Sequence, residues 1–219
     1  MSKDKEIIRT MSKKSEKKNL ILHHALKLFN ENGIEYVGMR EIAADLGFRV
    51  GNITYYFPTK NDIIEGLTAE LVELNSRVIV PVTGLTITGF MDMYSRVFEN
   101  QYEYRCLFIN FIHHLEQNKK FEQEYLSRQE KSYETLRNNM MELSANNYLK
   151  SKVDAEKMEH MVSGIGFISR FWLSEARVKF KKAPKKVLFQ HYLALLANFI
   201  MPYCNDKGKK EIKEFIAKL

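Results

Sequence analysis

The sequence is poor in the residues on which cross-linked and turn-rich folds depend. Its 219 residues include two cysteines, Cys106 and Cys204, and no C-x-x-C spacing, so neither a disulfide framework nor a cysteine-based zinc site is expected. With only 10 glycines and 4 prolines, the chain favours long helices over a β architecture with many turns. Polar and apolar residues nowhere alternate over the length of a strand, so we expect an all-α fold.

Signals for export or membrane insertion are weak as well. The first residues, MSKDKEIIRTMSKKSEKKN, lack the apolar core of a signal peptide, and we expect a cytoplasmic protein. Residues 187–205 carry no formal charge, but Gln190, His191 and Asn198 share one stripe of a helix and Pro202 interrupts its end. A helix buried in a core or a subunit interface is therefore favoured, with no membrane partner. The alternative is a helical interaction module or a membrane-attached one anchored by 187–205.

Catalytic and metal-binding patterns are also missing. The sequence contains no G-x-S-x-G elbow, no H-E-x-x-H and no phosphate-binding loop, so no enzyme is predicted. His113, His114, Glu116 and His160 could suggest a metal site, but adjacent histidines on a helix diverge by about 100° and no complete ligand set is identifiable. We expect no metal and no cofactor, and a helical enzyme or metal carrier stays open as a competing hypothesis.

Positive charge is concentrated at the N-terminal end. The formal charge is +7, and residues 1–60 carry 11 Lys/Arg against 7 Asp/Glu, whereas the other 159 residues carry 23 against 20. A basic head is typical of nucleic-acid-binding proteins, although many lysine-rich ends are merely solvated. A second basic cluster at 177–186 is interrupted by Ala183-Pro184, which favours a solvated loop between helices.

Apolar periodicity predicts helices along the whole chain. Leu22, Ala25, Leu26 and Phe29 form one face of a first helix over 15–32, and Gly33 ends it in a left-handed conformation. Two short helices follow at 40–46 and 50–57, the second stopped by Pro58. A fourth begins at Thr59, an N-cap with Asp62 in a capping box, and Asp154 is expected to cap a later helix. The remaining helices are expected near 88–102, 104–117, 120–148, 154–180, 185–201 and 207–218.

The most informative stretch is residues 39–60, MREIAADLGFRVGNITYYFPTK. Two short helices joined by a tight turn at Gly47 form a helix-turn-helix. In the second helix Ile53, Phe57 and Val50 mark the inward face, whereas Gly51 and Tyr55 point outward with Asn52 and Thr54 on the shoulders. This outward face is small, polar and aromatic, so it can approach phosphates and base edges closely and form hydrogen bonds with them. The alternative is a helical corner whose tyrosines pack internally.

This stretch resembles the TetR family of transcriptional regulators. The resemblance covers about residues 18–66 and rests on ALKLFNENG, MREIAADLG and GNITYYFPTKNDII. Ile42-Ala43, Gly47, Gly51, Phe57 and Lys60 match the family pattern directly. Thr54 stands where an aromatic residue is usual, and Arg49 stands where a small polar residue usually opens the recognition helix. The fold assignment is unaffected, whereas the choice of residues that touch bases depends on both positions.

The resemblance implies a role for each matching position. Arg40 would reach a phosphate or a guanine edge, and Gly51, Asn52 and Thr54 would face the major groove. Tyr55, Tyr56 and Lys60 would hold the flanking phosphates, with Lys60 aided by the N-terminus of the fourth helix. Arg49 is expected to contact a phosphate, and Val50 either meets a thymine methyl group or fills the core. The DNA-binding residues are Arg40, Arg49, Val50, Gly51, Asn52, Thr54, Tyr55, Tyr56 and Lys60.

Because short helices precede Glu65 and long ones follow it, we expect two domains: a DNA-binding head over 1–64, ordered from about residue 15, and a larger helical domain over 65–219. In this family the larger domain binds an effector and forms a homodimer through its last two long helices, here 154–180 and 185–201. The expected interface residues are Gly164, Gly166, Leu193, Leu196 and Ile200.

The expected function is a ligand-responsive repressor. It would bind double-stranded DNA at a palindromic operator as a homodimer and be released by a small, mostly apolar effector of unknown identity. Residues that are plain core or line an effector pocket are Phe90, Met93, Tyr94, Phe98, Phe108, Phe111, Met161, Phe167, Phe171 and Trp172.

Overall fold

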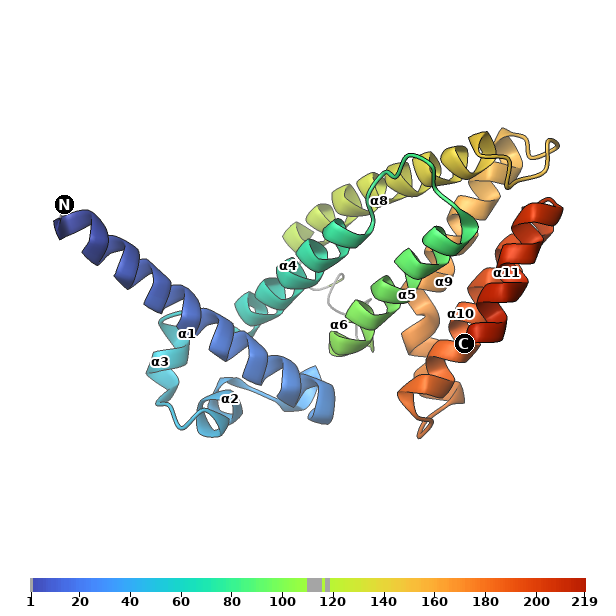
Figure 1. Ribbon diagram of the computed structural model, residues 1–219. Coiled ribbons are helices and arrows are strands. Elements are labelled where there is room, and N and C mark those ends of the chain that lie inside the picture. The colour runs from blue at the N-terminus through green and yellow to red at the C-terminus, as the bar shows by residue number, and fades with distance from the viewer. Residues whose placement is uncertain (1, 110–115, 117–118) are drawn as a thin grey trace. The chain divides into compact units, whose positions relative to one another are not determined.

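The computed structural model describes residues 2–109, 116 and 119–219, and every named element in these ranges is helical (Figure 1). The α-helices are α1 (Ser2–Asn32), α2 (Met39–Asp45), α3 (Val50–Thr54), α4 (Lys60–Val78), α5 (Ile87–Glu103), α6 (Cys106–Ile109), α8 (Lys119–Ala145), α9 (Ala155–Lys179), α10 (Lys185–Ile200) and α11 (Asp206–Lys218), with 3-10 turns η1 (Ile34–Tyr36) and η2 (Met201–Tyr203). The predicted all-α fold is therefore confirmed.

Several boundaries differ from those that the sequence predicts. α1 begins at Ser2 instead of about residue 15, since no glycine or proline interrupts residues 2–32. α3 ends at Thr54 instead of 57, and α8 ends at Ala145 because Asn147 takes a positive φ of 58°. The predicted helix 104–117 corresponds in part to α6, and the rest of it lies mostly outside the described residues.

The chain divides into two compact units. Unit 1 comprises Met1–Val72 with Tyr104–Asn110, and unit 2 comprises Glu73–Glu103 with Phe111–Leu219. α4 starts in unit 1 and ends in unit 2. The assignment of 1–64 to DNA binding and 65–219 to effector binding stays a prediction.

Unit 1 is built around a core to which every one of its helices contributes. The predicted inward residues Leu22, Ala25 and Phe29 of α1 are buried there, together with Ile42 and Ile53 from the two short helices. Burying each large aliphatic or aromatic side chain contributes roughly 1.5–3 kcal/mol. This packing holds the short helices α2 and α3, which would not be stable alone, against α1 and α4.

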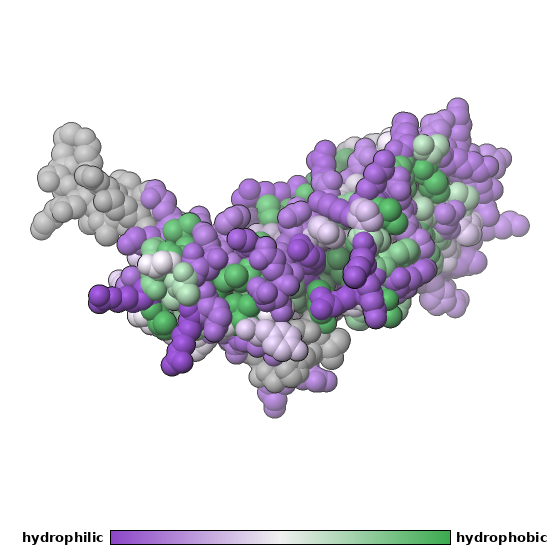
Figure 2. Space-filling view, turned by 90° about the horizontal axis from the view of Figure 1, so that it is seen from below, coloured by the Kyte–Doolittle hydropathy of each residue, from purple (hydrophilic) through white to green (hydrophobic). Residues whose placement is uncertain are grey.

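Unit 2 buries the inner faces of α5, α9 and α10. The rings of Phe98 and Trp172 stack with centroids 4.8 Å apart, and the Trp172 Nε1–H donates to Gln101 Oε1 at 2.6 Å. The charge-free segment 187–205 forms most of α10 and η2, and Leu196 and Cys204 are fully buried within the same chain. Among the described residues, no helix has the length and apolar character required to cross a membrane. On the face drawn in Figure 2, hydrophilic residues surround the hydrophobic ones.

The interface residues predicted on α9 and α10 have other roles in the structure. Leu193, Leu196 and Ile200 are buried inside unit 2, so their side chains cannot meet a partner subunit. An ideal Cβ on Gly164 would lie 2.1 Å from Phe199 Cζ, and one on Gly166 would lie 2.3 Å from Tyr133 Cε1. Both glycines thus admit aromatic rings of their own chain, and their part in a dimer interface stays a prediction.

Candidate nucleic-acid interface

The turn between α2 and α3 has the geometry that the sequence predicts. Gly47 takes a φ of +66° and its N–H donates to Ala44 O at 3.1 Å, while the Phe48 N–H donates to Ala43 O at 2.8 Å. These two hydrogen bonds form a Schellman motif, which ends α2 sharply and needs a residue that tolerates positive φ. The turn brings α3 back across α2, as in a helix-turn-helix.

α3 turns a small polar and aromatic face outward. Ile53 is fully buried and Phe57 nearly so, whereas Gly51, Asn52 and Tyr55 are exposed, Tyr55 by 70%. No heavy atom beyond the local backbone lies within 4 Å of an ideal Cβ on Gly51, so the surface there is open. An uncharged ridge of this kind is suited to close approach to a groove.

Three residues of α3 and its C-terminal turn differ in exposure from a simple helical wheel. Val50, expected on the inward face, is 37% exposed because it opens the helix and has no preceding turn to cover it. The Thr54 hydroxyl donates to Gly51 O at 3.3 Å and is only partly exposed. Tyr56 is half-buried against the core of unit 1, and its ring meets that of Tyr55 edge-on at 5.0 Å.

Lys60 is engaged inside unit 1. Its Nζ donates to the carbonyl oxygen of Ile34 at 2.9 Å and is partly buried, so the amine fastens the start of α4 to η1. This differs from the role that the resemblance implies, in which the ammonium is directed at phosphate. The capping box at this helix start is confirmed, since the Thr59 N–H donates to Asp62 Oδ2 at 2.7 Å and the Asp62 N–H donates to the Thr59 hydroxyl.

Exposed cationic side chains lie on α2, before α3 and on α1. Arg40 at the start of α2 and Arg49 before α3 are both exposed. Lys14 of α1, which the sequence did not single out, places its Nζ 5.8 Å from the centroid of the Tyr55 ring. Only the basic N-terminal composition could have pointed to this residue.

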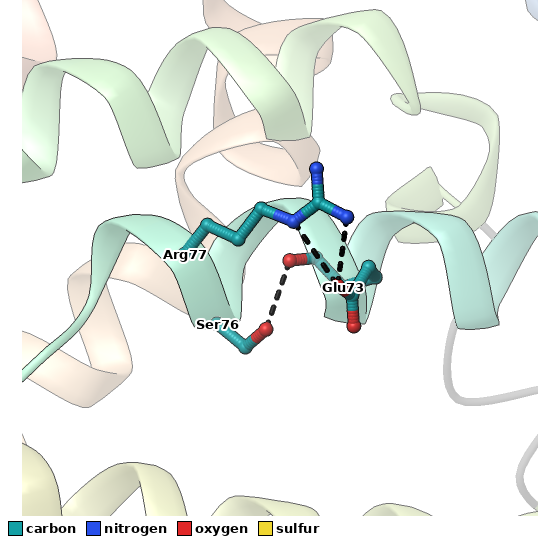
Figure 3. A network of polar contacts seen from close by, with 3 residues as sticks. All are labelled: Glu73, Ser76 and Arg77. Atoms are coloured by element: carbon teal, nitrogen blue, oxygen red, sulfur yellow. Dashed lines mark hydrogen bonds and ion pairs between the residues drawn. The ribbon is translucent and has the colours of Figure 1, made fainter.

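α4 connects the two units as one continuous helix. Figure 3 shows its turn beyond the unit boundary, where the Arg77 guanidinium donates to Glu73 Oε1 at 2.9 and 3.0 Å and the Ser76 hydroxyl donates to the Glu73 carbonyl. Glu and Arg stand four residues apart in the favourable order and are both exposed, so this pair contributes only about 0.3–0.5 kcal/mol to helix stability. The side chain of Asn100 on α5 donates to that of Asn75 at 3.0 Å and ties the same end of α4 into unit 2.

The predicted pocket residues do not all lie together. Phe90, Met93, Tyr94, Phe98, Met161 and Trp172 are buried in unit 2, and Phe171 is partly buried there. Phe108 instead packs against the core of unit 1, because α6 belongs to that unit. Phe167 is 63% exposed on α9 and is therefore not part of an interior site. Phe111 lies outside the described residues.

Among the described residues of unit 2, Asn139 Oδ1 and the Tyr192 hydroxyl are buried without a hydrogen-bond partner. The other side-chain atom of Asn139, Nδ2, has only the Met93 sulfur at 3.8 Å, which is a weak acceptor. Burial raises the pKa of the Tyr94 hydroxyl far above its usual value, so this group stays neutral. The amide of Asn139 and the hydroxyls of Tyr94 and Tyr192 are thus uncharged, and two of these three groups lack a strong hydrogen-bond partner.

The histidines and the glutamate that the sequence analysis weighed as metal ligands form no site within the described residues. No group of three or more His, Cys, Asp or Glu side chains gathers in the described ranges, and His160 is exposed on α9. His113 and His114 lie outside these ranges.

Comparison with known proteins identifies the family. A sequence profile described as TetR, bacterial transcriptional repressor, matches residues 71–212, and one described as bacterial regulatory proteins, tetR family, matches residues 21–67. A Bacillus subtilis (strain 168) protein described as a probable HTH-type transcriptional regulator, YttP, is 36% identical over 62 residues. These residues span 28% of this chain and 30% of that relative.

Solved structures share the fold at low sequence identity. A TetR-family transcriptional regulator from Marinobacter aquaeolei VT8 has a TM-score of 0.82 and 19% identity over 92% of this chain and 97% of its own. A transcriptional regulator from Saccharomonospora viridis, solved in complex with choline, has a TM-score of 0.67 and 16% identity over 87% and 99%. A gamma-butyrolactone receptor described as ArpA-like has a TM-score of 0.65 and 13% identity over 94% and 97%. Since the repressor profile alone matches more than half of the sequence, and the second profile matches the helix-turn-helix region, the chain belongs to the TetR family of bacterial DNA-binding transcriptional regulators.

Proposed function

We propose that this regulator is a ligand-responsive repressor that binds a palindromic operator as a homodimer. The observation that carries the proposal is the outward face of α3, where Gly51, Asn52 and Tyr55 are exposed above a buried Ile53. In this proposal Asn52 reads base edges, Tyr55 and Arg49 contact phosphates, and Gly51 lets the backbone approach the groove.

Operator selection from random duplexes tests this assignment. The full-length protein should enrich a palindrome with half-sites about 34–36 Å apart. Asn52→Ala should then weaken binding by about 1–3 kcal/mol and relax preference at particular base pairs. An equal loss on every duplex would show that Asn52 does not read bases, and a protein that enriches no sequence would refute operator recognition.

The proposed interface of the homodimer is formed by the exposed faces of α9 and α10. Phe167 and Val178 on α9 are 63% and 75% exposed, and they lie on one stripe of that helix. On α10, Val187 and Leu195 are also exposed, with Leu195 at 45%. Large apolar side chains on two successive helices favour burial against a second subunit. These residues replace the buried leucines and the glycines as interface candidates.

A charge placed on this face tests the dimer. The double variant Phe167→Glu/Leu195→Glu should sediment as a monomer, because the carboxylates would be buried in an apolar contact. Leu126→Glu on α8 is the matched control, since Leu126 is 54% exposed and lies outside α9 and α10. A double variant that stays dimeric at micromolar concentration would place the interface elsewhere.

The effector of the proposed repressor is a small, neutral and mostly apolar molecule bound inside unit 2. The buried polar side chains in the described part of the chain are Gln101 and Asn139, and neither carries a charge. An unpaired buried acceptor such as Asn139 Oδ1 costs about 1–3 kcal/mol, which a ligand with a hydrogen-bond donor would recover. The structural neighbours solved with choline and described as a gamma-butyrolactone receptor support small organic effectors in general.

Thermal-shift screening with neutral alcohols, amides and lactones, and with charged molecules for comparison, tests this effector class. A neutral ligand should raise the melting temperature and weaken operator binding, and the operator must weaken ligand binding by the same factor. Asn139→Leu should abolish the ligand-induced shift, whereas Asn138→Leu, on the exposed neighbour, should retain it. A ligand whose shift survives in Asn139→Leu does not use this amide.

A further inference from the structure

We propose that the N-terminal part of α1, residues 2–18, is a second DNA-contacting arm that binds phosphates beside the base pairs read by α3. This inference rests on the proposed operator binding and extends it to a segment outside the helix-turn-helix. The bounds of the helix define the arm, since α1 begins at Ser2, well before Ile21, its first residue in the core of unit 1.

Burial divides α1 into two parts. From Ile21 onward one face of the helix is buried in the core of unit 1, whereas residues 14–20 are all exposed. Figure 1 shows the helix running on beyond α3 toward its N-terminus, away from the rest of this unit. An exposed helical segment such as residues 14–20 gains little stability from packing, so a partner that binds it would stabilise it.

The charge of the head lies in this arm. Residues 1–18 carry 7 Lys/Arg and 3 Asp/Glu, whereas residues 19–60 carry 4 of each. The helix-turn-helix and its supporting core are therefore electrically balanced, and the excess of +4 belongs to the arm. Neutralisation of phosphates supplies most of the sequence-independent affinity for DNA. Because residues 19–60 carry no net charge, lysines in the adjacent arm would add to the affinity of the helix-turn-helix for DNA.

Two contacts connect the C-terminal end of the arm with α3 and the segment after it, and the first of them lies at the reading face. Lys14 Nζ lies 5.8 Å from the Tyr55 ring centroid, and Lys18 Nζ lies 5.7 Å from that of Phe57. Because Tyr55 projects from the exposed face of α3, Lys14 stands at the edge of that face. With a rise of 1.5 Å per residue, the helix reaches about 18 Å further to Ser2, a length comparable to about five base pairs.

The chemistry of the arm suits phosphates better than bases. Lysine ammonium groups are flexible point charges that bind phosphate oxygens without the planar fork that reads guanine. The arm should therefore increase affinity for every duplex and lengthen the protected site, while the sequence preference stays with α3.

The test compares variants on the selected operator over a range of salt concentrations. Lys14→Ala/Lys17→Ala should reduce the slope of log K against log salt by about 1.8 per protomer, or about 0.9 per lost contact. Deletion of residues 2–12 should also shorten the hydroxyl-radical footprint at both outer edges. The matched control Lys131→Ala/Lys213→Ala removes the same charge from exposed positions of unit 2 and should leave slope and footprint unchanged.

The outcomes separate the arm from the function on which it depends. If the wild-type protein binds the operator but the arm variants keep its slope and footprint, the arm is refuted and operator binding stands. An equal effect of the unit 2 control would also refute the arm, because net charge alone would then explain it. A wild-type protein that binds no duplex refutes the proposed function and the arm together.

Discussion

A glutamate at position 51 should weaken operator binding by about 10-fold or more while the protein remains folded. The space around an ideal Cβ on Gly51 is open to 4 Å, so the substitution meets no steric barrier in the free protein. Replacing glycine within α3 also removes its unfavourable helix propensity, worth about 0.5–1 kcal/mol. The free energy of unfolding should therefore stay constant or rise slightly.

The loss on DNA follows from charge repulsion. A carboxylate about 6 Å from a phosphate is repelled by about 0.7 kcal/mol at the dielectric constant of water and about 2.8 kcal/mol at an effective value of 20. A homodimer carries the substitution twice, so affinity should fall between about 10-fold and 10⁴-fold from repulsion alone. Steric exclusion of the backbone from the groove adds to this loss.

Fluorescence anisotropy with a labelled operator measures the affinity, and thermal unfolding followed by circular dichroism measures the stability. Gly51→Gln is the matched control, because it adds similar bulk without charge and separates repulsion from steric exclusion. Retention of wild-type affinity by Gly51→Glu would refute the placement of α3 against DNA. A large fall in melting temperature would instead mean that the surface at Gly51 is not open.

Three further outcomes are expected from single contacts. Lys60→Ala should lower the stability of unit 1 by about 1.5–3 kcal/mol, measurable by urea unfolding, because a partly buried carbonyl of η1 loses a charged donor. Gly164→Ala should lower the melting temperature of unit 2, since the new methyl group would overlap the Phe199 ring. The hydrogen bond from His24 Nδ1 to Asp45 Oδ2, 2.6 Å long, holds the pKa of Asp45 below its usual value. The stability from this pair is complete above the unfolded pKa of about 3.9 and is lost as the pH falls through the lower folded value, so Asp45→Asn should flatten the acid side of the stability curve.

Local features of the fold could be predicted from the sequence because their causes are local. The capping box at Thr59 and Asp62 needs two residues three apart, and Asp154 caps α9 by accepting from the Lys157 N–H at 2.9 Å. The positive φ of Gly47 follows equally from a short helix ending at glycine. The outward direction of Tyr55 follows from the spacing of its buried neighbours.

Pairings between distant residues could not be predicted in this way. α10 is apolar on most of its circumference, so its periodicity does not separate the face that meets α5 and α11 from the face that is exposed. For this reason buried Leu196 was expected at an interface, while exposed Leu195 was overlooked. Likewise, no local signal connects Gly166 to Tyr133 on α8 or the Lys60 amine to a carbonyl 26 residues earlier.

α4 is the element through which we expect an effector to act on the helix-turn-helix of α2 and α3. An ideal Cβ on Gly66 would lie 2.9 Å from Leu22 Cδ2 and 3.4 Å from Phe57 Cε1, so α4 packs tightly against α1 and against the segment that ends α3. At its other end Asn75 accepts the hydrogen bond from Asn100 on α5, which also carries buried residues of the proposed effector site. If, as proposed, an effector displaces α5, the contact between Asn100 and Asn75 would pass the displacement to α4, whose Gly66 packs against Leu22 and Phe57. The coupling free energy between effector and operator then equals the difference in the effector's binding free energy between the DNA-binding and the displaced positions of α4. The operator must weaken effector binding by the same factor as the effector weakens operator binding.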